Sequence, residues 1–281
     1  MKSHIMLWSV TLGIVLMASA VFMARTQRSD SPVGTESVDA LVARAITLLE
    51  DDGNMLHQET RSAIRMAAAI VEAGSVTTAQ EALVLALQYK NEQNFQGAEA
   101  SFKHAIALDP NWSWSYAELG NLLGRNSYNR TDEAMDDLRK AVALDPEWGR
   151  PYNIMAVILR AQGRYEEARV EAEKALKIMP DDISPLNNYA NLLVDLERYD
   201  EAEIYFRKAI ERSPDHPKPY YNLACLYSLR GRTRESLDYL REAFQRSDLF
   251  RLEAMNDPDL AGIKDNPEFK ALVEREPVTP S

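Results

Sequence analysis

The chain has 281 residues, of which 46% are hydrophobic, 13 are proline and 11 are glycine. This composition excludes a disordered chain and favours a well-packed helical one. The 32 basic and 43 acidic residues give a net charge of −11, which argues against a nucleic-acid partner because an acidic surface repels phosphate. The single cysteine, Cys225, excludes an internal disulfide and a cysteine-rich zinc site.

The first predicted element is an apolar helix at the N-terminus. Residues 5–24 contain no charged side chain, and twenty helical residues span roughly 30 Å, the thickness of a bilayer core. We therefore expect residues 1–28 to form a single-pass membrane anchor. The alternative is a secretory signal that is cleaved near Ala20, because the small residues 18–20 follow a shorter apolar run. Basic residues flank the segment on both sides, so the sequence leaves open which side of the membrane holds the rest of the chain.

Two shorter segments follow the apolar helix. Residues 29–37 are small and polar and include Pro32 and Gly34, which predicts a flexible linker. Residues 38–77 contain two stretches with helical periodicity. We interpret these residues as a degenerate helical hairpin.

The rest of the chain is repetitive. Pro110, Pro146, Pro180 and Pro214 are spaced 36, 34 and 34 residues apart, and an alanine recurs five and twelve residues before each of them. Small residues at this spacing share one face of a helix and allow a second helix to approach closely. The other half of each unit has large apolar residues at spacings of three and four, which predicts an amphipathic helix. Each unit is therefore expected to be a pair of helices, and the proline ends the second one.

This pattern resembles the tetratricopeptide repeat. One repeat has Tyr116, Leu119, Gly120, Ala134, Ala141 and Pro146 at the family positions, and the repeat before it has Leu85, Ala86, Tyr89, Ala98, Phe102, Ala105 and Pro110. The resemblance implies an all-α fold, a right-handed superhelical solenoid of antiparallel helix pairs, with five repeats in residues 78–247. Residues 248–281 resemble a C-terminal cap and tail in which Phe269 and Leu272 pack on the last repeat.

The 36-residue interval contains two residues more than the family spacing of 34. The extra residues fall within 125–130. We expect them to lengthen the turn between the two helices of that repeat without disturbing either helix.

Residues that would support catalysis are missing from the sequence. The four histidines are scattered without the spacing of metal ligands, and neither a glycine-rich phosphate loop nor a nucleophile elbow occurs. Pairs of carboxylates such as Asp136 and Asp137 are typical of solvated helix faces. We therefore predict that the chain is not an enzyme and holds neither a cofactor nor a metal.

Asparagine is the notable polar residue of the repeats. In the family, the first helix of each pair lines a concave groove, and an amide can pair with the main chain of an extended peptide because it offers both a donor and an acceptor. Asparagine is also common in the repeat consensus, where it bonds neighbouring helices. The residues predicted to line a partner-binding groove are Asn121, Arg125, Asn153, Arg160, Asn187, Asn188, Asn191, Lys218, Tyr221 and Asn222.

These observations predict a non-catalytic scaffold, tethered to a membrane through residues 5–24, that binds a protein or an extended peptide in its groove. Two alternatives remain open. The chain could be a self-associating assembly factor, or it could be the regulatory subunit of an enzyme complex whose chemistry is supplied by another chain.

Overall fold

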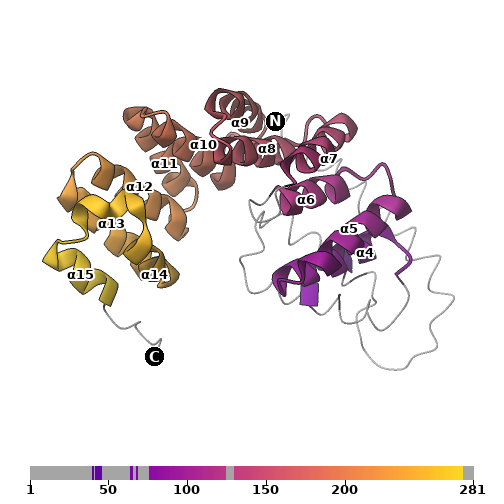
Figure 1. Cartoon of the computed structure of the whole chain (residues 1–281), viewed down its shortest axis with the longest axis horizontal. Helices are drawn as coiled ribbons and strands as arrows, with labels where there is room; N and C mark the ends of the chain where they lie inside the picture. Colours follow the sequence, from indigo (N-terminus) through magenta and orange to yellow (C-terminus); the bar gives the residue numbers. More distant parts are fainter. Residues whose placement is uncertain are drawn as a thin grey trace. The chain divides into compact units, whose positions relative to one another are not determined.

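The computed structural model describes residues 40, 42–45, 64–65, 68, 76–124 and 130–274. Within these ranges all regular structure is helical (Figure 1). None of the described helices has the length and apolar character to cross a membrane. The predicted anchor at residues 5–24, the linker at 29–37, Arg125 and the lengthened turn within 125–130 lie wholly or almost wholly outside the described residues.

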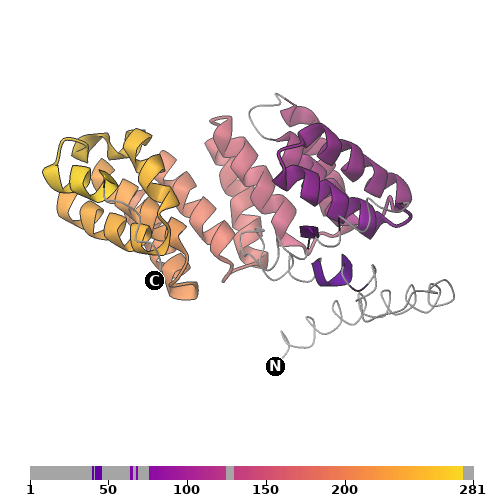
Figure 2. The same ribbon diagram turned by 90° about the horizontal axis from the view of Figure 1, so that it is seen from below.

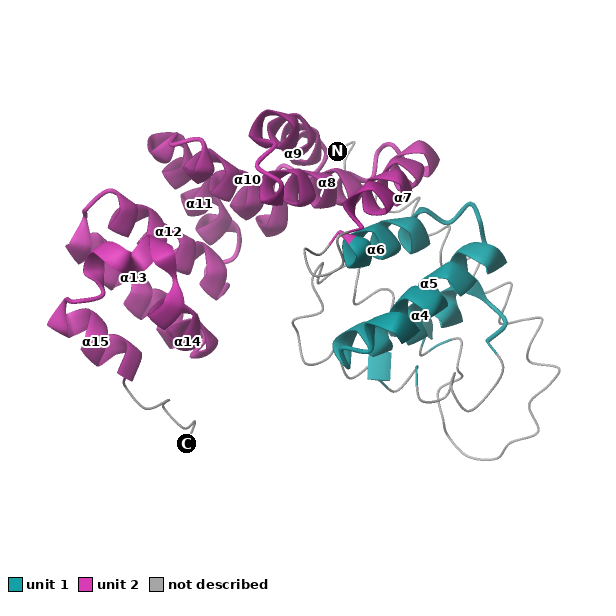
Figure 3. Cartoon of the chain, viewed as in Figure 1, with its two compact units in different colours: residues 1–123 teal, residues 124–281 magenta. Residues whose placement is uncertain are grey.

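The chain divides into two compact units, residues 1–123 and 124–281 (Figure 3). The boundary falls inside one of the predicted repeats. The first unit contains α4 (Ala79–Asn91), α5 (Phe95–Leu108) and α6 (Ser113–Leu123). Helices α4 and α5 pack on one another as a hairpin, and α6 packs on α5. Of the predicted hairpin at 38–77, the described helical residues Val42, Ala45, Ile64 and Ala68 are buried.

The second unit contains the remaining elements. They are α7 (Thr131–Leu144), α8 (Gly149–Ala161), α9 (Tyr165–Ile178), α10 (Ile183–Asp195), α11 (Tyr199–Arg212), α12 (Pro217–Leu229), α13 (Thr233–Arg246), α14 (Leu249–Asn256), the 3-10 helix η2 (Pro258–Ile263) and α15 (Pro267–Glu274). We call the first helix of each repeat the A helix and the second the B helix. The pairs α8 and α9, α10 and α11, and α12 and α13 follow one another in chain order (Figure 2).

Small residues hold the two helices of each pair together, as the sequence predicted. The alanines that precede each proline by five and twelve residues are fully buried in all four B helices, α5, α7, α9 and α11. Phe102, Leu138 and Phe206 lie between them and are also fully buried. In the last repeat Ser236 replaces the usual alanine, and its hydroxyl donates a 2.7 Å hydrogen bond to the carbonyl of Ala224. The serine therefore fits the buried position because its polar group is paired.

Three-residue turns join the helices of each described pair. The middle residue of each turn has a positive φ, 72° at Gly163 and 70° at Gly231, but also 60° at Gln93 and 58° at Glu197. A left-handed residue at this point is a common way to end a helix, and glycine takes this conformation without steric cost. The turns therefore reverse the chain in the same way whether or not glycine is present.

The C-terminal segment covers the end of the last repeat. Leu260, Ile263 and Phe269 are buried in one cluster with Leu240 and Phe244, and Leu272 packs against this cluster. Helix α12 contacts η2 directly. The terminal repeat of a solenoid exposes an apolar side that needs such a cover for solubility. Residues 249–274 provide this cover.

Candidate functional site on the A helices

Helices α8, α10 and α12 form the candidate site in the second unit. Successive A helices contact one another, α8 with α10 and α10 with α12. Their apolar sides are buried against the B helices, and most of the predicted groove residues lie beside that buried stripe. We call this surface the A-helix face. It comprises Asn153, Arg160, Asn187, Asn188, Asn191, Lys218 and Asn222.

Four asparagines of the A-helix face form two matching pairs. The Asn188 amide nitrogen donates to the Asn153 oxygen at 3.1 Å, and the Asn222 amide nitrogen donates to the Asn187 oxygen at 2.9 Å. Both pairs span 35 residues, so the same contact joins α8 to α10 and α10 to α12. These amides therefore link neighbouring repeats, which is the structural role that asparagine also has in the repeat consensus. Their assignment to a partner stays a prediction.

Asn191 differs from these four because its side chain makes no hydrogen bond to any residue that the structure describes. It is half-buried on α10. The residue at the same position of α8 is Val157, whose side chain is 42% exposed. An amide with its donor and acceptor free therefore lies at the same register as an exposed apolar side chain on the neighbouring helix. The sequence analysis missed Val157, although its 34-residue spacing from Asn191 was available to find it.

The two basic residues of the A-helix face have different surroundings. The Arg160 guanidinium pairs with both carboxylate oxygens of Asp195, through its Nε and through an NH2 group at 3.1 Å from Oδ1. This ion pair joins the C-terminal ends of α8 and α10. Lys218 at the start of α12 is exposed. Only Lys218 of the two therefore presents a cation that is not already held by a neighbouring helix.

Tyr221 is covered by the C-terminal segment. Its side chain is 2% exposed, its hydroxyl donates to Asp257 at 2.7 Å, and its ring lies 4.8 Å from that of Phe250. The Cys225 thiol donates to the same Asp257 oxygen at 3.6 Å. In this structure Tyr221 is thus a cap contact rather than an open surface residue. The sequence could not show this, because residues 249–263 lie outside the repeat pattern.

Cys225, Asp257 and Asp259 bring three possible metal-ligand atoms within 4.8 Å of one another. The thiol is not suited to bind a metal here, because burial and the nearby Asp257 raise its pKa well above the ordinary value and only the thiolate is a strong ligand. Burial, Asp257 and Asp195 also raise the pKa of Asp259, an effect that Arg160 opposes. The cluster therefore reads as the polar part of the contact between the cap and α12.

The first unit contributes Asn121 and a buried ion pair. Asn121 is half-buried on α6. Glu118 on the same helix occupies the position that Asn188 and Asn222 hold in their repeats. The Lys90 ammonium of α4 lies 2.8 Å from the Glu118 carboxylate, with side-chain exposures of 12% and 1%. An ion pair thus links the A helices α4 and α6, where amides link those of the second unit.

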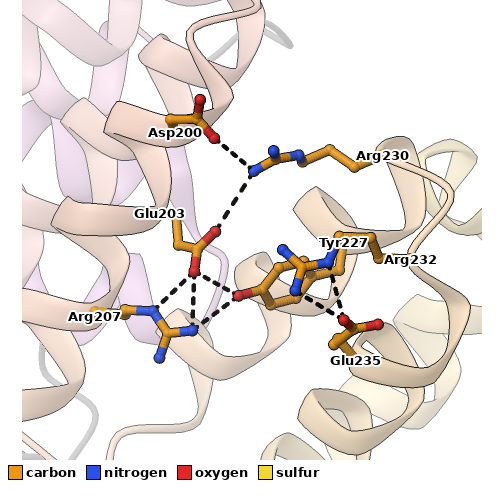
Figure 4. A network of polar contacts seen from close by, with 7 residues as sticks. All are labelled: Asp200, Glu203, Arg207, Tyr227, Arg230, Arg232 and Glu235. Carbon is orange, nitrogen blue, oxygen red and sulfur yellow. Dashed lines mark hydrogen bonds and ion pairs between the residues drawn. The ribbon is translucent and has the colours of Figure 1, made fainter.

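On the side away from the A-helix face, a polar network joins the last two repeats (Figure 4). The Tyr227 hydroxyl of α12 donates to the Glu203 carboxylate of α11 at 2.6 Å, and Arg207 donates to both groups. The hydrogen bonds from Tyr227 and Arg207 outweigh burial and lower the Glu203 pKa. Burial and the Glu203 carboxylate raise the pKa of Tyr227 to about 12. The tyrosine therefore stays a hydrogen-bond donor at neutral pH, which suits a structural contact.

Comparison with known proteins agrees with this architecture. Family models described as tetratricopeptide repeat match residues 83–111, 149–182 and 181–248. The chain carries tetratricopeptide repeats. The matched segments coincide with helices whose buried alanines and closing prolines were described above. No match was found among curated proteins.

Solved structures of other tetratricopeptide repeat proteins are similar in fold. PilW, a type IV pilus biogenesis factor, is 18% identical, with 69% of this chain and 90% of that chain covered and a TM-score of 0.59. PilF of Pseudomonas aeruginosa is 19% identical, covers 77% of this chain and 97% of its own, and has a TM-score of 0.52. TTC0263 of Thermus thermophilus is 21% identical, with coverages of 60% and 92% and a TM-score of 0.55. At these identities the likeness establishes the fold of the repeats.

Proposed function

We propose that the chain is a non-catalytic interaction scaffold whose A-helix face binds an extended segment of a partner protein. Tetratricopeptide repeats are interaction modules, and the observation that carries this proposal is the free amide of Asn191 beside exposed Val157. The amide can accept and donate one main-chain hydrogen bond each, and the valine can contact an apolar side chain of the same segment. Lys218 adds an exposed cation further along the face.

The asparagine pairs have a supporting role in this proposal. Asn153, Asn187, Asn188 and Asn222 are bonded to one another, so they fix the spacing between α8, α10 and α12. That spacing sets where Asn191 and Val157 lie relative to a bound peptide. Substitution of a paired asparagine is therefore expected to change stability as well as binding, and Asn191 is the better test of direct contact.

The experiment selects binding peptides from a phage-displayed library with the full chain as bait. A selected peptide is then measured against the parent, Asn191→Ala and the control Gln245→Ala, which removes an exposed amide from the B helix α13. We expect Asn191→Ala to weaken binding about tenfold, the effect of losing about 1.4 kcal/mol of hydrogen bonding. The control should bind like the parent.

Main-chain recognition has a separate signature. N-methylation of one peptide bond at a time removes a donor without changing the side chains. We expect one or two methylated positions to abolish binding to the parent protein. Equal binding by the parent and Asn191→Ala, or sensitivity to side-chain changes alone, contradicts the proposal.

We also propose that residues 5–24 tether the scaffold to a membrane. The support is their uncharged sequence and its length. Amino-terminal sequencing of the protein from the membrane fraction tests this proposal. An intact N-terminus supports an anchor, whereas a mature chain that starts at Val21 shows a cleaved signal.

Self-association is a second candidate function, because α14 presents an apolar stripe. Leu249, Leu252 and Met255 are 79%, 71% and 48% exposed, and their spacing of three places them on one side of the helix. A second copy of the chain could cover this stripe. The role of a regulatory subunit stays a prediction that no described residue favours.

A further inference from the structure

The seam between the B helices α7 and α9 contains a cavity of about 410 Å³. Its floor is formed by Tyr152, Met155 and Leu159 of the A helix α8. Met135 of α7 lines it from one side and Glu171 of α9 from the other. The cavity therefore lies opposite the A-helix face, and none of the asparagines discussed above lines it.

The next two seams show what fills this space elsewhere in the same chain. Tyr205 of α11 and Tyr239 of α13 follow Glu171 at intervals of 34 residues. The ring of Tyr205 lies edge-on to Tyr189, 4.8 Å between centroids, and Tyr189 is the repeat equivalent of Met155. In each of these seams a tyrosine from the later B helix thus packs on the floor formed by the A helix.

Tyr239 repeats this arrangement over the other two floor positions. Its ring stacks on Tyr227 at 5.4 Å and contacts Tyr220 at 6.4 Å. Tyr227 and Tyr220 are the equivalents of Leu159 and Tyr152. Taken together, the two tyrosines contact all three positions that form the floor of the α7–α9 cavity.

Glu171 cannot fill the cavity in the same way. Its carboxylate is paired with the Lys174 ammonium at 2.9 Å, and moving a carboxylate onto an apolar floor would cost much of its hydration. Val170 beside it remains 45% exposed. The space that a tyrosine ring occupies in the later seams is therefore open to a ring from outside.

The cavity also has the cation that accompanies the ring in a later seam. Arg207 lies with its guanidinium carbon 5.9 Å from the centroid of Tyr239, and its equivalent two repeats earlier is Arg139, which lines the cavity. Lys174 lies 5.5 Å from the Tyr152 ring on the floor. Cations near a ring face attract its π electrons, so this lining suits an aromatic side chain better than an aliphatic one.

We propose that the α7–α9 seam is a second binding site, which accepts a tyrosine-like aromatic side chain from a partner protein. The ring takes the place that Tyr205 and Tyr239 hold in the following seams, on Met155 and Leu159 and within reach of Arg139. This site is independent of the A-helix face, so either proposal can fail without the other.

The test uses 4-methylphenol, the side chain of tyrosine, as the probe and the full chain labelled with ¹³C at its methionine methyl groups. Met135 and Met155 report on the cavity, and Met255 on α14 reports on an exposed apolar surface elsewhere. We expect saturable shifts of the Met135 and Met155 signals, with the Met255 signal unchanged. Equal shifts at Met255 would show unspecific contact and overturn the proposal.

Glu171→Tyr supplies the missing ring from within the chain. We expect this variant to shift the Met155 signal without any probe, to melt at a higher temperature than the parent, and to bind 4-methylphenol at least tenfold more weakly. The control Glu211→Tyr adds a tyrosine at an exposed position of α11 and should bind like the parent. If Glu171→Tyr does not fold, Glu171→Leu places a smaller apolar group at the same position and should also weaken binding. Parent-like binding by the folded variant overturns the proposal.

Discussion

Tyr227 joins two repeats through both its ring and its hydroxyl group. The ring stacks on Tyr239, and the hydroxyl contacts Glu203 and Arg207 of the preceding B helix (Figure 4). The residue is 1% exposed, so its hydrogen bonds have little competition from water. The repeat pattern predicts only a large apolar residue here, because the earlier repeats have leucine at this position.

Tyr227→Phe keeps the ring and removes the hydroxyl. We expect it to lower the free energy of unfolding by about 1–2 kcal/mol, the range for a hydrogen bond to a charged group. Urea unfolding followed by circular dichroism measures this change. Tyr165→Phe, at an exposed position of α9, is the matched control and should unfold like the parent. An equal effect of both substitutions would contradict the role given to the Tyr227 hydroxyl.

Asp259 makes the stability of the cap depend on pH. Its pKa is raised by burial and by Asp257 and Asp195, so the folded state binds its proton more tightly than the unfolded state does. For a carboxyl group with a raised pKa, stability falls as pH rises through the titration range and is regained at lower pH. The ionised form present at neutral pH is therefore the unfavourable one.

We accordingly expect Asp259→Asn to raise the melting temperature at pH 7, by about 1–3 °C if the change in stability is below about 1 kcal/mol. The difference from the parent should shrink as pH falls toward about 4, the ordinary pKa of an aspartate. Thermal unfolding at a series of pH values tests this. A difference that grows on acidification would show that Asp259 is stabilised in its ionised form.

Among the elements, the short helices of the cap act on the last repeat. Phe269 of α15 is 3% exposed and shares a cluster with Leu240 and Phe244 of α13. The same cap buries Cys225, which is the only cysteine of the chain. Access to this thiol therefore reports directly on whether the cap is in place.

Phe269→Ala removes the main apolar anchor of α15 and leaves a cavity behind. We expect the cap to open more often, and the reaction of Cys225 with Ellman's reagent at pH 8 to become at least tenfold faster. Leu252→Ala, at an exposed position of the same cap, is the control and should react like the parent. A rate that is unchanged in Phe269→Ala would mean that η2 alone protects the thiol.

How much the sequence reveals also differs between elements. The period of 34 residues, the buried alanines and the closing prolines predict the helix pairs in the correct order, because these features depend only on neighbouring helices of one pair. The pairing of Asn222 with Asn187 depends on the rotation of one repeat against the next, which the spacing alone does not define. The cover over Tyr221 comes from η2, a segment without any repeat signature. The candidate site is therefore predicted as a set of residues but not as a set of contacts.

At the scale of the whole molecule, the oligomeric state separates the two candidate functions. The cap covers the end of the last repeat, which favours a monomer, whereas the stripe of Leu249, Leu252 and Met255 on α14 would favour association. We expect residues 29–281 to be monomeric at micromolar concentration in light scattering. A dimer that dissociates on Leu252→Glu would instead support self-association through α14.

The spacing of the contacts has a consequence for how the chain is made. Among the hydrogen bonds described above, the one that spans the most sequence joins Tyr221 to Asp257, a separation of 36 residues. The links between successive A helices span 35 residues. Each repeat thus has its contacts available once about one further repeat has been synthesised. The array can fold vectorially behind the ribosome or an export channel, one repeat after another, without waiting for its C-terminus.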